Sequence, residues 1–239
     1  MTICFFLKKP NQAFITHSHA DHCYLIPYLY SRNRKLDIYA PEPCIQYMHP
    51  YLKSAQNLND CQPDSFEKFV LHGVKTGNTI DISKNLYSVH VIECVHTVPS
   101  VGYLFYERRS KLKDEYKNLD GKSLAQLRKE KVNVSEEVLV PLFAFLGDTL
   151  PTVFDQYGEQ LFKFPYIITE CTFLDGEQSS DKGHTHWSAL RPYVEKNPQC
   201  NFVLIHFSCA LKDEEIAEFF SKKEAVLKNV IPFGVNKQQ

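Results

Sequence analysis

The chain has 239 residues, 44% of them hydrophobic and 23% charged, with a formal net charge of −1 at pH 7. This composition excludes a disordered or strongly basic chain and fits one domain over residues 1–239 with a sizeable core. No apolar run is long enough for a transmembrane helix and the N-terminus lacks a secretory pattern. We therefore expect an intracellular, soluble protein, without an indication of its compartment.

The first informative segment is His17-Ser18-His19-Ala20-Asp21-His22, which follows the apolar stretch at 13–16. It places three imidazoles and one carboxylate within six residues. These are the ligand types of catalytic zinc sites. Because alternate residues of an extended turn point the same way, one short loop can serve two neighbouring metal ions. A solvated cluster of surface histidines is the less informative alternative.

The rest of the chain shows alternating strand and helix patterns. Helices are expected over 21–30, 43–56, 120–131, 187–196 and 212–228, and strands over 67–72, 79–82, 86–96, 101–106, 141–147, 165–170 and 202–205. The strand at 101–106 is expected to pair with the one before it. Strand runs followed by helices predict sheets covered by helices.

Three of these strands end in further metal-ligand side chains. His96 follows the run at 91–95, Asp148 follows 141–147, and His206 follows 202–205. A single histidine after a strand is more often structural than functional. Their recurrence, after the first cluster, predicts a metal site in loops at the edge of a sheet.

HSHADH with His96, Gly147-Asp148-Thr149 and His206 resembles the metallo-β-lactamase superfamily. Five stretches are similar to its ribonuclease Z branch, which removes the 3′ trailer from precursor tRNA: FIT at 14–16, HTVPSVGY at 96–103, FLGDT at 145–149, ECTF at 170–173 and HFS at 206–208. The resemblance covers roughly residues 12–210. It implies an α/β (α+β) fold, a four-layer αββα sandwich of two mixed sheets with helices outside.

The resemblance also implies two Zn²⁺ ions, with Mn²⁺ as an alternative, and a role for each ligand. His17, His19 and His96 would bind one ion, Asp21, His22 and His206 the other, and Asp148 both. A metal-activated hydroxide would attack phosphorus, with Asp21 orienting the water. The general acid implied for the leaving 3′-oxygen is His184, held by Glu170, and His186 is a rival for that role.

Residues 107–131 hold nine basic side chains against five acidic ones. They form either a solvated helix face or a surface that contacts phosphates. In the ribonuclease Z branch this region carries an arm that grips tRNA. Here the interval is short and lacks the usual Gly/Pro-rich sequence, so we do not expect an arm of the usual kind.

Three departures from the family pattern affect the functional prediction. Thr169 stands where a histidine is common, Cys209-Ala210-Leu211 replaces a segment with an arginine, and only 16 residues precede the HSHADH segment. The chain is therefore either truncated or has a reduced first sheet, whose open edge favours a homodimer. We predict removal of the 3′ trailer of precursor tRNA, leaving a 3′-hydroxyl. The alternatives are a dinuclear hydrolase of small phosphodiesters and a non-catalytic scaffold.

Overall fold

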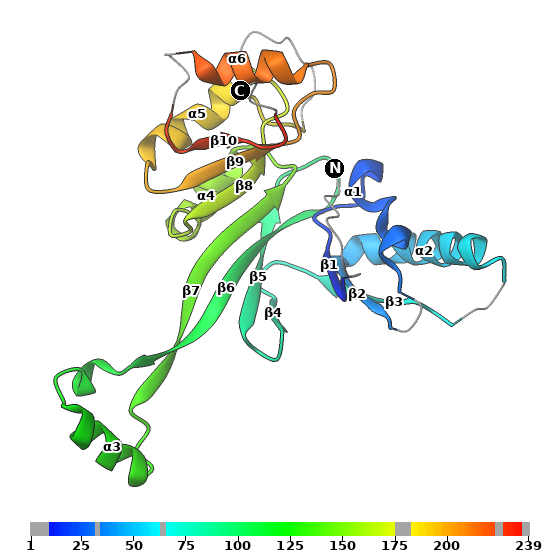
Figure 1. Cartoon of the computed structure of the whole chain (residues 1–239). Coiled ribbons are helices and arrows are strands. Elements are labelled where there is room, and N and C mark those ends of the chain that lie inside the picture. The colour runs from blue at the N-terminus through cyan, green and yellow to red at the C-terminus, as the bar shows by residue number, and fades with distance from the viewer. Residues whose placement is uncertain (1–9, 32–33, 63–65, 175–182, 223–226, 236–239) are drawn as a thin grey trace.

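The computed structural model describes residues 10–31, 34–62, 66–174, 183–222 and 227–235. Within these ranges the strands form two sheets (Figure 1). The smaller sheet is parallel and has the order β1-β2-β3, from Gln12–Phe14, Leu36–Pro41 and Phe69–Val74. The larger sheet has the order β10-β9-β8-β7-β6-β5-β4. Its strands are β4 (Thr79–Ile82), β5 (Tyr87–Cys94), β6 (Ser100–Leu112), β7 (Ser135–Gly147), β8 (Tyr166–Glu170), β9 (Asn201–Ile205) and β10 (Val230–Pro232).

The helices of the described ranges are α1 (Ala20–Cys23), α2 (Ile45–Asp60), α3 (Gly121–Lys129), α4 (Thr152–Leu161), α5 (Trp187–Lys196) and α6 (Asp213–Ser221). Short 3₁₀ turns occur at η1 (Ile26–Leu29), η2 (Glu42–Cys44) and η3 (Asp114–Tyr116). None of the helices in the described ranges is long and apolar enough to cross a membrane.

Most of the predicted elements are present. The helix at 187–196 and the strand at 79–82 are confirmed at both ends, and β5 and β6 pair antiparallel as expected. The prediction of one helix over 21–30 is wrong. The observed helix α1 ends at Cys23, because Pro27 has no N–H to continue it, and the 3₁₀ turn η1 begins at Ile26. The helix predicted over 212–228 is shorter, since Lys222 is extended, and 223–226 lie outside the described residues.

The packing of alternate residues on β5 and β6 explains the layers. Val91 and Tyr103 belong to a core between the two sheets, against which Phe14 packs. Their neighbours Ile92 and Leu104 belong to a second core that includes residues of α4 and α5. A third core lies between the small sheet and α2. Because side chains alternate across a strand, these three cores separate four layers, and the predicted αββα sandwich is confirmed.

Tyr103 ties the two sheets together. It is fully buried, and its hydroxyl lies 2.8 Å from the carbonyl oxygen of Ile15 and 3.1 Å from that of Tyr39. Burial of a large aromatic ring stabilises the fold by about 2–3 kcal/mol, and the hydroxyl is satisfied inside the core. The contact with Ile15 fixes the segment that leads into His17.

Residues 107–135 protrude from the body as an arm (Figure 1). β6 and β7 continue as a two-stranded antiparallel ribbon from the pair Glu107–Val140 to Leu112–Ser135, with α3 beyond them. A bulge lies where the pairing skips from Phe143 to Pro141, and such bulges bend and twist a strand pair. The arm is therefore present. It is made of a β-ribbon and a helix, without the Gly/Pro-rich sequence whose absence argued against it.

Candidate active site

The strand order explains why distant residues meet at one edge of the large sheet. β7, β8 and β9 are parallel to one another, and β5 runs in the same direction because both it and β7 are antiparallel to β6. Their carboxyl ends therefore lie at the same edge. Four of the predicted site residues lie at this edge, at the end of a strand or shortly after it: His96, Asp148, Glu170 and His206. The loop after β1 brings His17 to the same place.

Two backbone features allow this close approach. Gly147 has φ +62°, and a Cβ there would lie 2.7 Å from the Thr16 hydroxyl oxygen, so only glycine lets β7 come this near. His206 has φ 60°, in the left-handed region that non-glycine residues rarely adopt. Such strain persists where the surroundings hold a residue in place, and it is common at functional sites.

The first group of donor atoms comes from His17, His19 and His96, whose ligand atoms lie within 4.8 Å of one another. His96 Nε2 is 3.1 Å from His19 Nδ1. The outer ring nitrogens have their own partners. His17 Nδ1 is 3.0 Å from the Thr16 hydroxyl, and His96 Nδ1 is 2.8 Å from the Gly183 carbonyl oxygen. The inner nitrogens are thereby left facing the centre of the group.

The second group comes from Asp21, His22 and His206. Asp21 Oδ2 lies 3.3 Å from His22 Nε2 and 3.2 Å from His206 Nε2. Asp148 lies between the two groups, since its Oδ2 is 3.3 Å from both His22 Nε2 and His206 Nε2 and 3.8 Å from His17 Nε2. The structure therefore brings together all seven residues predicted as metal ligands.

The donor set fits divalent metal ions on an observation independent of the family pattern. His17 Nε2, His22 Nε2 and Asp148 Oδ1 are buried, yet none has a hydrogen-bond partner among the described residues. Buried polar atoms are nearly always satisfied, because leaving one unpaired costs about 1–3 kcal/mol. Three such atoms in one site indicate that something else normally satisfies them.

The pKa values of His17 and Asp148 are shifted toward the protonation states that metal ligands need. Burial, aided by the neighbouring His22, lowers the pKa of His17 to about 3, so its ring is neutral and keeps a lone pair. Burial acts to raise the pKa of Asp148, but the adjacent imidazoles of His22, His206 and His17 lower it to about 2. Neutral imidazoles and ionised carboxylates suit zinc, and carboxylates also accept manganese.

Glu170 and His184 form a pair beside these groups. Glu170 is fully buried, and its Oε2 lies 3.0 Å from His184 Nδ1. The amides of Thr149 and Thr185 donate to the same carboxylate at 2.8 and 3.0 Å. His184 Nδ1 also lies 3.8 Å from Asp148 Oδ2, so the pair adjoins the donor groups.

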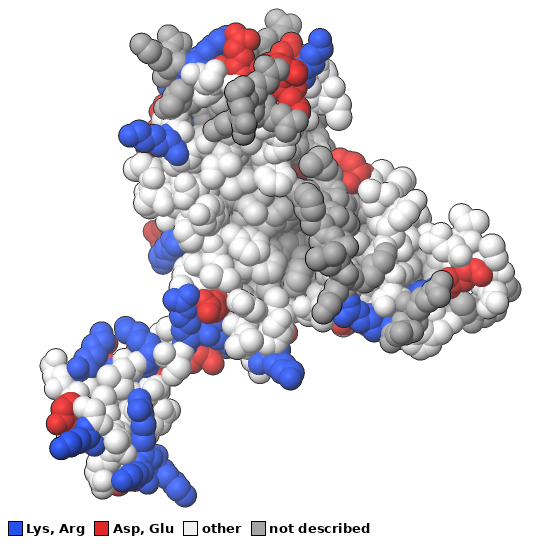
Figure 2. All heavy atoms as spheres, viewed as in Figure 1, with Lys and Arg blue, Asp and Glu red and all other residues white. Residues whose placement is uncertain are grey.

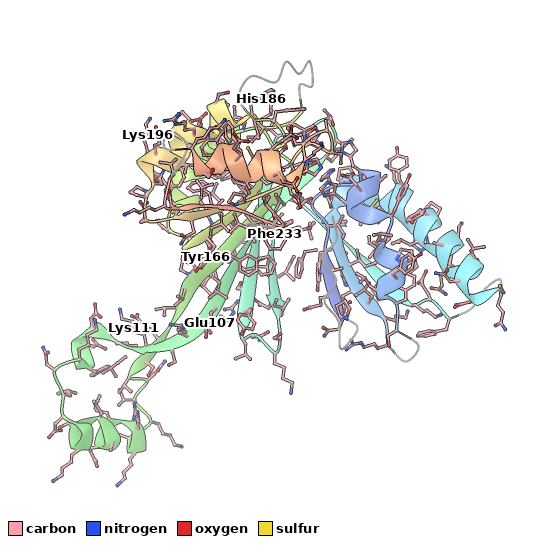
Figure 3. All side chains as sticks on the ribbon, turned by 45° about the horizontal axis from the view of Figure 1, so that its top comes forward. Glu107, Lys111, Tyr166, His186, Lys196 and Phe233 are labelled. Atoms are coloured by element: carbon pink, nitrogen blue, oxygen red, sulfur yellow. The ribbon has the colours of Figure 1, made fainter. Side chains whose placement is uncertain are left out.

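His186, the rival for the acid role, lies elsewhere. It precedes α5 (Figure 3). Its ring centroid lies 4.8 Å from that of Phe173. Sequence reasoning missed two hydroxyl groups of the site, Thr16 and Thr172. Each stands within two residues of a predicted site residue and lies in a stretch that resembles the ribonuclease Z branch, FIT at 14–16 or ECTF at 170–173.

Relatives with curated descriptions agree on one family, although no family model matches the chain. It is 32% identical to tRNase Z TRZ1 of Arabidopsis thaliana over 216 residues, covering 87% of this chain and 76% of that protein. Chloroplastic tRNase Z TRZ2 of the same plant is 31% identical, with 92% and 64% covered. Ribonuclease Z of Pyrococcus abyssi is 29% identical, with 83% and 69% covered.

Solved structures agree on the fold. The metallo-β-lactamase fold protein YhfI of Bacillus subtilis matches with a TM-score of 0.57 at 11% identity, covering 92% of this chain and 73% of that one. The short form of human tRNase Z matches with a TM-score of 0.53 at 19% identity, covering 84% and 73%. With the Arabidopsis relationship, these findings show that the chain belongs to the ribonuclease Z (tRNase Z) family of metal-dependent hydrolases, within the metallo-β-lactamase fold.

Proposed function

We propose that this chain is a zinc-dependent endoribonuclease, with residues 1–239 acting as one hydrolase domain, that removes the 3′ trailer of precursor tRNA and leaves a 3′-hydroxyl. The observation that carries the proposal is the Glu170–His184 pair, placed 3.8 Å from Asp148 at the junction of two metal-ligand groups. A phosphodiester cut needs both a source of hydroxide and a proton for the leaving oxygen. The site offers groups for each.

His17, His19 and His96 would hold one ion, Asp21, His22 and His206 the second, and Asp148 both. When bound, two zinc ions would lower the pKa of water to about 7 and offset the charge of the phosphate. The three unpartnered buried atoms of His17, His22 and Asp148 support this assignment. Manganese is the alternative metal, because two of the ligands are carboxylates.

The protein's own groups supply the proton transfers. Glu170 accepts a hydrogen bond from His184 Nδ1, which fixes the imidazole tautomer and leaves Nε2 to carry the proton for the leaving 3′-oxygen. Burial acts to raise the pKa of Asp21, but the neighbouring imidazoles of His22 and His206 lower it. The Asp21 side chain is 58% exposed and ionised, so it can orient an attacking water.

The arm supplies a contact surface for the substrate backbone. Four cations on and just after α3 are exposed and have no acidic partner within ion-pair distance in the described part of the chain: Lys122, Arg128, Lys129 and Lys131. Figure 2 shows Lys and Arg side chains concentrated on this protrusion. Cations that meet phosphates release counterions, so this surface would bind tRNA in a salt-dependent manner.

One observation favours the second candidate, a hydrolase of small phosphodiesters. The three residues after His206-Phe207-Ser208 are Cys209, Ala210 and Leu211, so no cation follows at the place where the family has an arginine. A smaller substrate would need fewer such contacts.

The test compares two substrates with the same protein. Zinc-loaded, manganese-loaded and chelator-treated protein would be given a 3′-extended precursor tRNA and a small chromogenic phosphodiester. The proposal expects metal-dependent cleavage of the tRNA, and the loss of that cleavage in His184→Ala but not in the matched His186→Ala. Hydrolysis of only the small substrate would favour the second candidate.

A homodimer is the proposed assembly. Exposed apolar side chains gather on the segment from α1 to η1 and on α2, where Tyr24, Leu25, Tyr28 and Tyr47 are 58%, 50%, 74% and 72% exposed. The Tyr24 ring lies 5.2 Å from Tyr51 of α2, so these elements form one continuous surface. Large exposed apolar patches usually mark interaction sites.

Light scattering should give the mass of two chains, and Tyr47→Lys should lower that mass. A single-chain mass for the unaltered protein would reject the dimer.

A further inference from the structure

Thr172 lies between the acid pair and a metal-ligand residue. It stands two residues after Glu170, and its side chain is buried. The Thr172 hydroxyl oxygen is 2.6 Å from Glu170 Oε2, 2.9 Å from His206 Nδ1 and 3.4 Å from His184 Nδ1. One hydroxyl thus contacts three side chains that come from three different segments of the chain.

The direction of each hydrogen bond follows from what the neighbours require. His206 Nε2 faces the carboxylates Asp21 and Asp148, on the side where a ligand lone pair is needed. The ring proton of neutral His206 therefore resides on Nδ1 and is donated to the Thr172 oxygen. The hydroxyl has one proton of its own, and the carboxylate of Glu170, at 2.6 Å, is the acceptor in reach.

The contact between Thr172 and His184 is weaker and of a different kind. His184 Nδ1 is 3.0 Å from Glu170 Oε2 but 3.4 Å from the Thr172 oxygen, so its proton goes to the carboxylate. A continuous chain results, in which His206 donates to Thr172, Thr172 donates to Glu170, and His184 donates to the same carboxylate oxygen.

We propose that Thr172 is a positioning residue that couples His206 to Glu170, so that a single buried carboxylate orients both the proton donor and a metal ligand. The proposal deepens and rests on the proposed function, because it gives His184 and His206 the roles assigned there. Partners that orient a ligand histidine typically change metal affinity by about 10–100-fold when removed.

The backbone of His206 explains why such a partner is needed. Its φ of 60° is unfavourable for a residue with a Cβ, so the local chain alone does not hold the ring in this position. The hydrogen bond to Thr172 fixes the ring from the side opposite the metal-ligand group. It also fixes the tautomer, which decides whether Nε2 can act as a ligand.

A matched pair of substitutions separates the hydroxyl from the rest of the side chain. Thr172→Val keeps the shape but removes the hydroxyl, whereas Thr172→Ser keeps the hydroxyl and removes a methyl group. In both variants the Thr172 carbonyl oxygen can still accept the hydrogen bond from the Ser208 amide, which is 2.9 Å long in the structure. The loop around His206 therefore keeps its backbone support.

The experiment measures zinc affinity by chelator competition, then kcat and KM on precursor tRNA and on a small phosphodiester, and the melting temperature of metal-free protein. Thr172→Val should lower the affinity of the zinc site that includes His206 by about 10–100-fold and lower kcat at saturating zinc, with KM changed by less than about threefold. Thr172→Ser should return both quantities to within about threefold of the unaltered protein.

Two results would overturn the proposal. The first is a Thr172→Val protein with unaltered zinc affinity and kcat. The second is a Thr172→Ser protein as impaired as Thr172→Val, with both melting at lower temperature, which would make the role of Thr172 one of packing. Zinc affinity needs no substrate. A zinc-affinity loss rescued by serine, in a protein that never cuts tRNA, would therefore support the coupling and reject the proposed substrate.

Discussion

The sheet edge that carries the metal-ligand groups and the arm differ in how deeply their charged side chains are buried. At the edge, His17, Asp148 and Glu170 are almost completely buried, and three buried polar atoms lack partners within the described residues. On the arm, α3 buries no residue, and its cations Lys122, Arg128 and Lys129 are exposed. The chemistry expected at the edge depends on the position of each atom. The binding expected at the arm depends on the density of positive charge.

This difference separates two kinds of sensitivity. A displaced group at the edge affects every neighbour that shares its hydrogen bonds or ligand position, because the low local dielectric strengthens these interactions. Exposed ion pairs contribute little to stability and are screened by salt. Changes at the edge should therefore act on the chemical step, and changes in the arm on substrate binding.

The largest effect is expected at Asp148, which lies between the two ligand groups. Asp148→Asn should abolish turnover and remove bound metal, because it takes away the negative charge that faces three imidazoles. The measurement is metal content together with precursor tRNA cleavage. Asp114→Asn, which alters an exposed arm carboxylate, is the matched control and should retain both. Full activity of Asp148→Asn would contradict the dinuclear site.

A large but narrower effect is expected at His184. His184→Ala should lower kcat by about 10²–10⁴-fold while metal content stays unchanged, because it removes only the proton donor. Kinetics and metal analysis on the same preparation give the result. The possible ligand atoms of His184, Asp148 and His96 lie within 4.8 Å of one another. Metal loss in this variant would therefore identify His184 as a metal ligand instead.

The arm should behave in the opposite way. Replacing Lys122, Arg128, Lys129 and Lys131 together by glutamine should raise KM for precursor tRNA and leave kcat and small-substrate hydrolysis unchanged. The dependence of log KM on log salt should become shallower by up to about 0.7–0.9 for each phosphate that the variant no longer neutralises. An unchanged salt dependence would show that these cations do not bind the substrate.

The smallest effect concerns thiol reactivity. Burial raises the pKa of Cys94 to about 12, so its thiolate is scarce under ordinary conditions, whereas Cys209 is exposed. Mass spectrometry after mild alkylation should find Cys209 modified and Cys94 intact. Rapid modification of Cys94 in folded protein would show that the interior beside the edge opens.

The sequence predicted the edge well because each element there carries a local signal. An apolar run ending in His96, Asp148 or His206 reveals both a strand and the residue at its end. The arm lacked such a signal, because its protrusion depends on β6 and β7 keeping their pairing beyond the body. The helix predicted over 21–30 fails for a local reason, because Pro27 has no N–H with which to continue it.

Other features depend on contacts between distant segments. The separation of His184 from His186 relies on the position of Glu170, and the placement of Thr172 relies on the loop that holds His206. No pattern within one segment reveals these contacts. They become visible only when the strand ends are brought to a common edge.

The most direct test of the division between edge and arm is cleavage of a 3′-extended precursor tRNA by zinc-loaded protein, with the cut mapped to the nucleotide. We expect one metal-dependent cut just after the nucleotide that precedes the CCA position, with a 3′-hydroxyl on the tRNA. The arm variant should make the same cut at higher substrate concentration. A metal-loaded protein that leaves this RNA intact, or cuts it at scattered positions, would contradict the account.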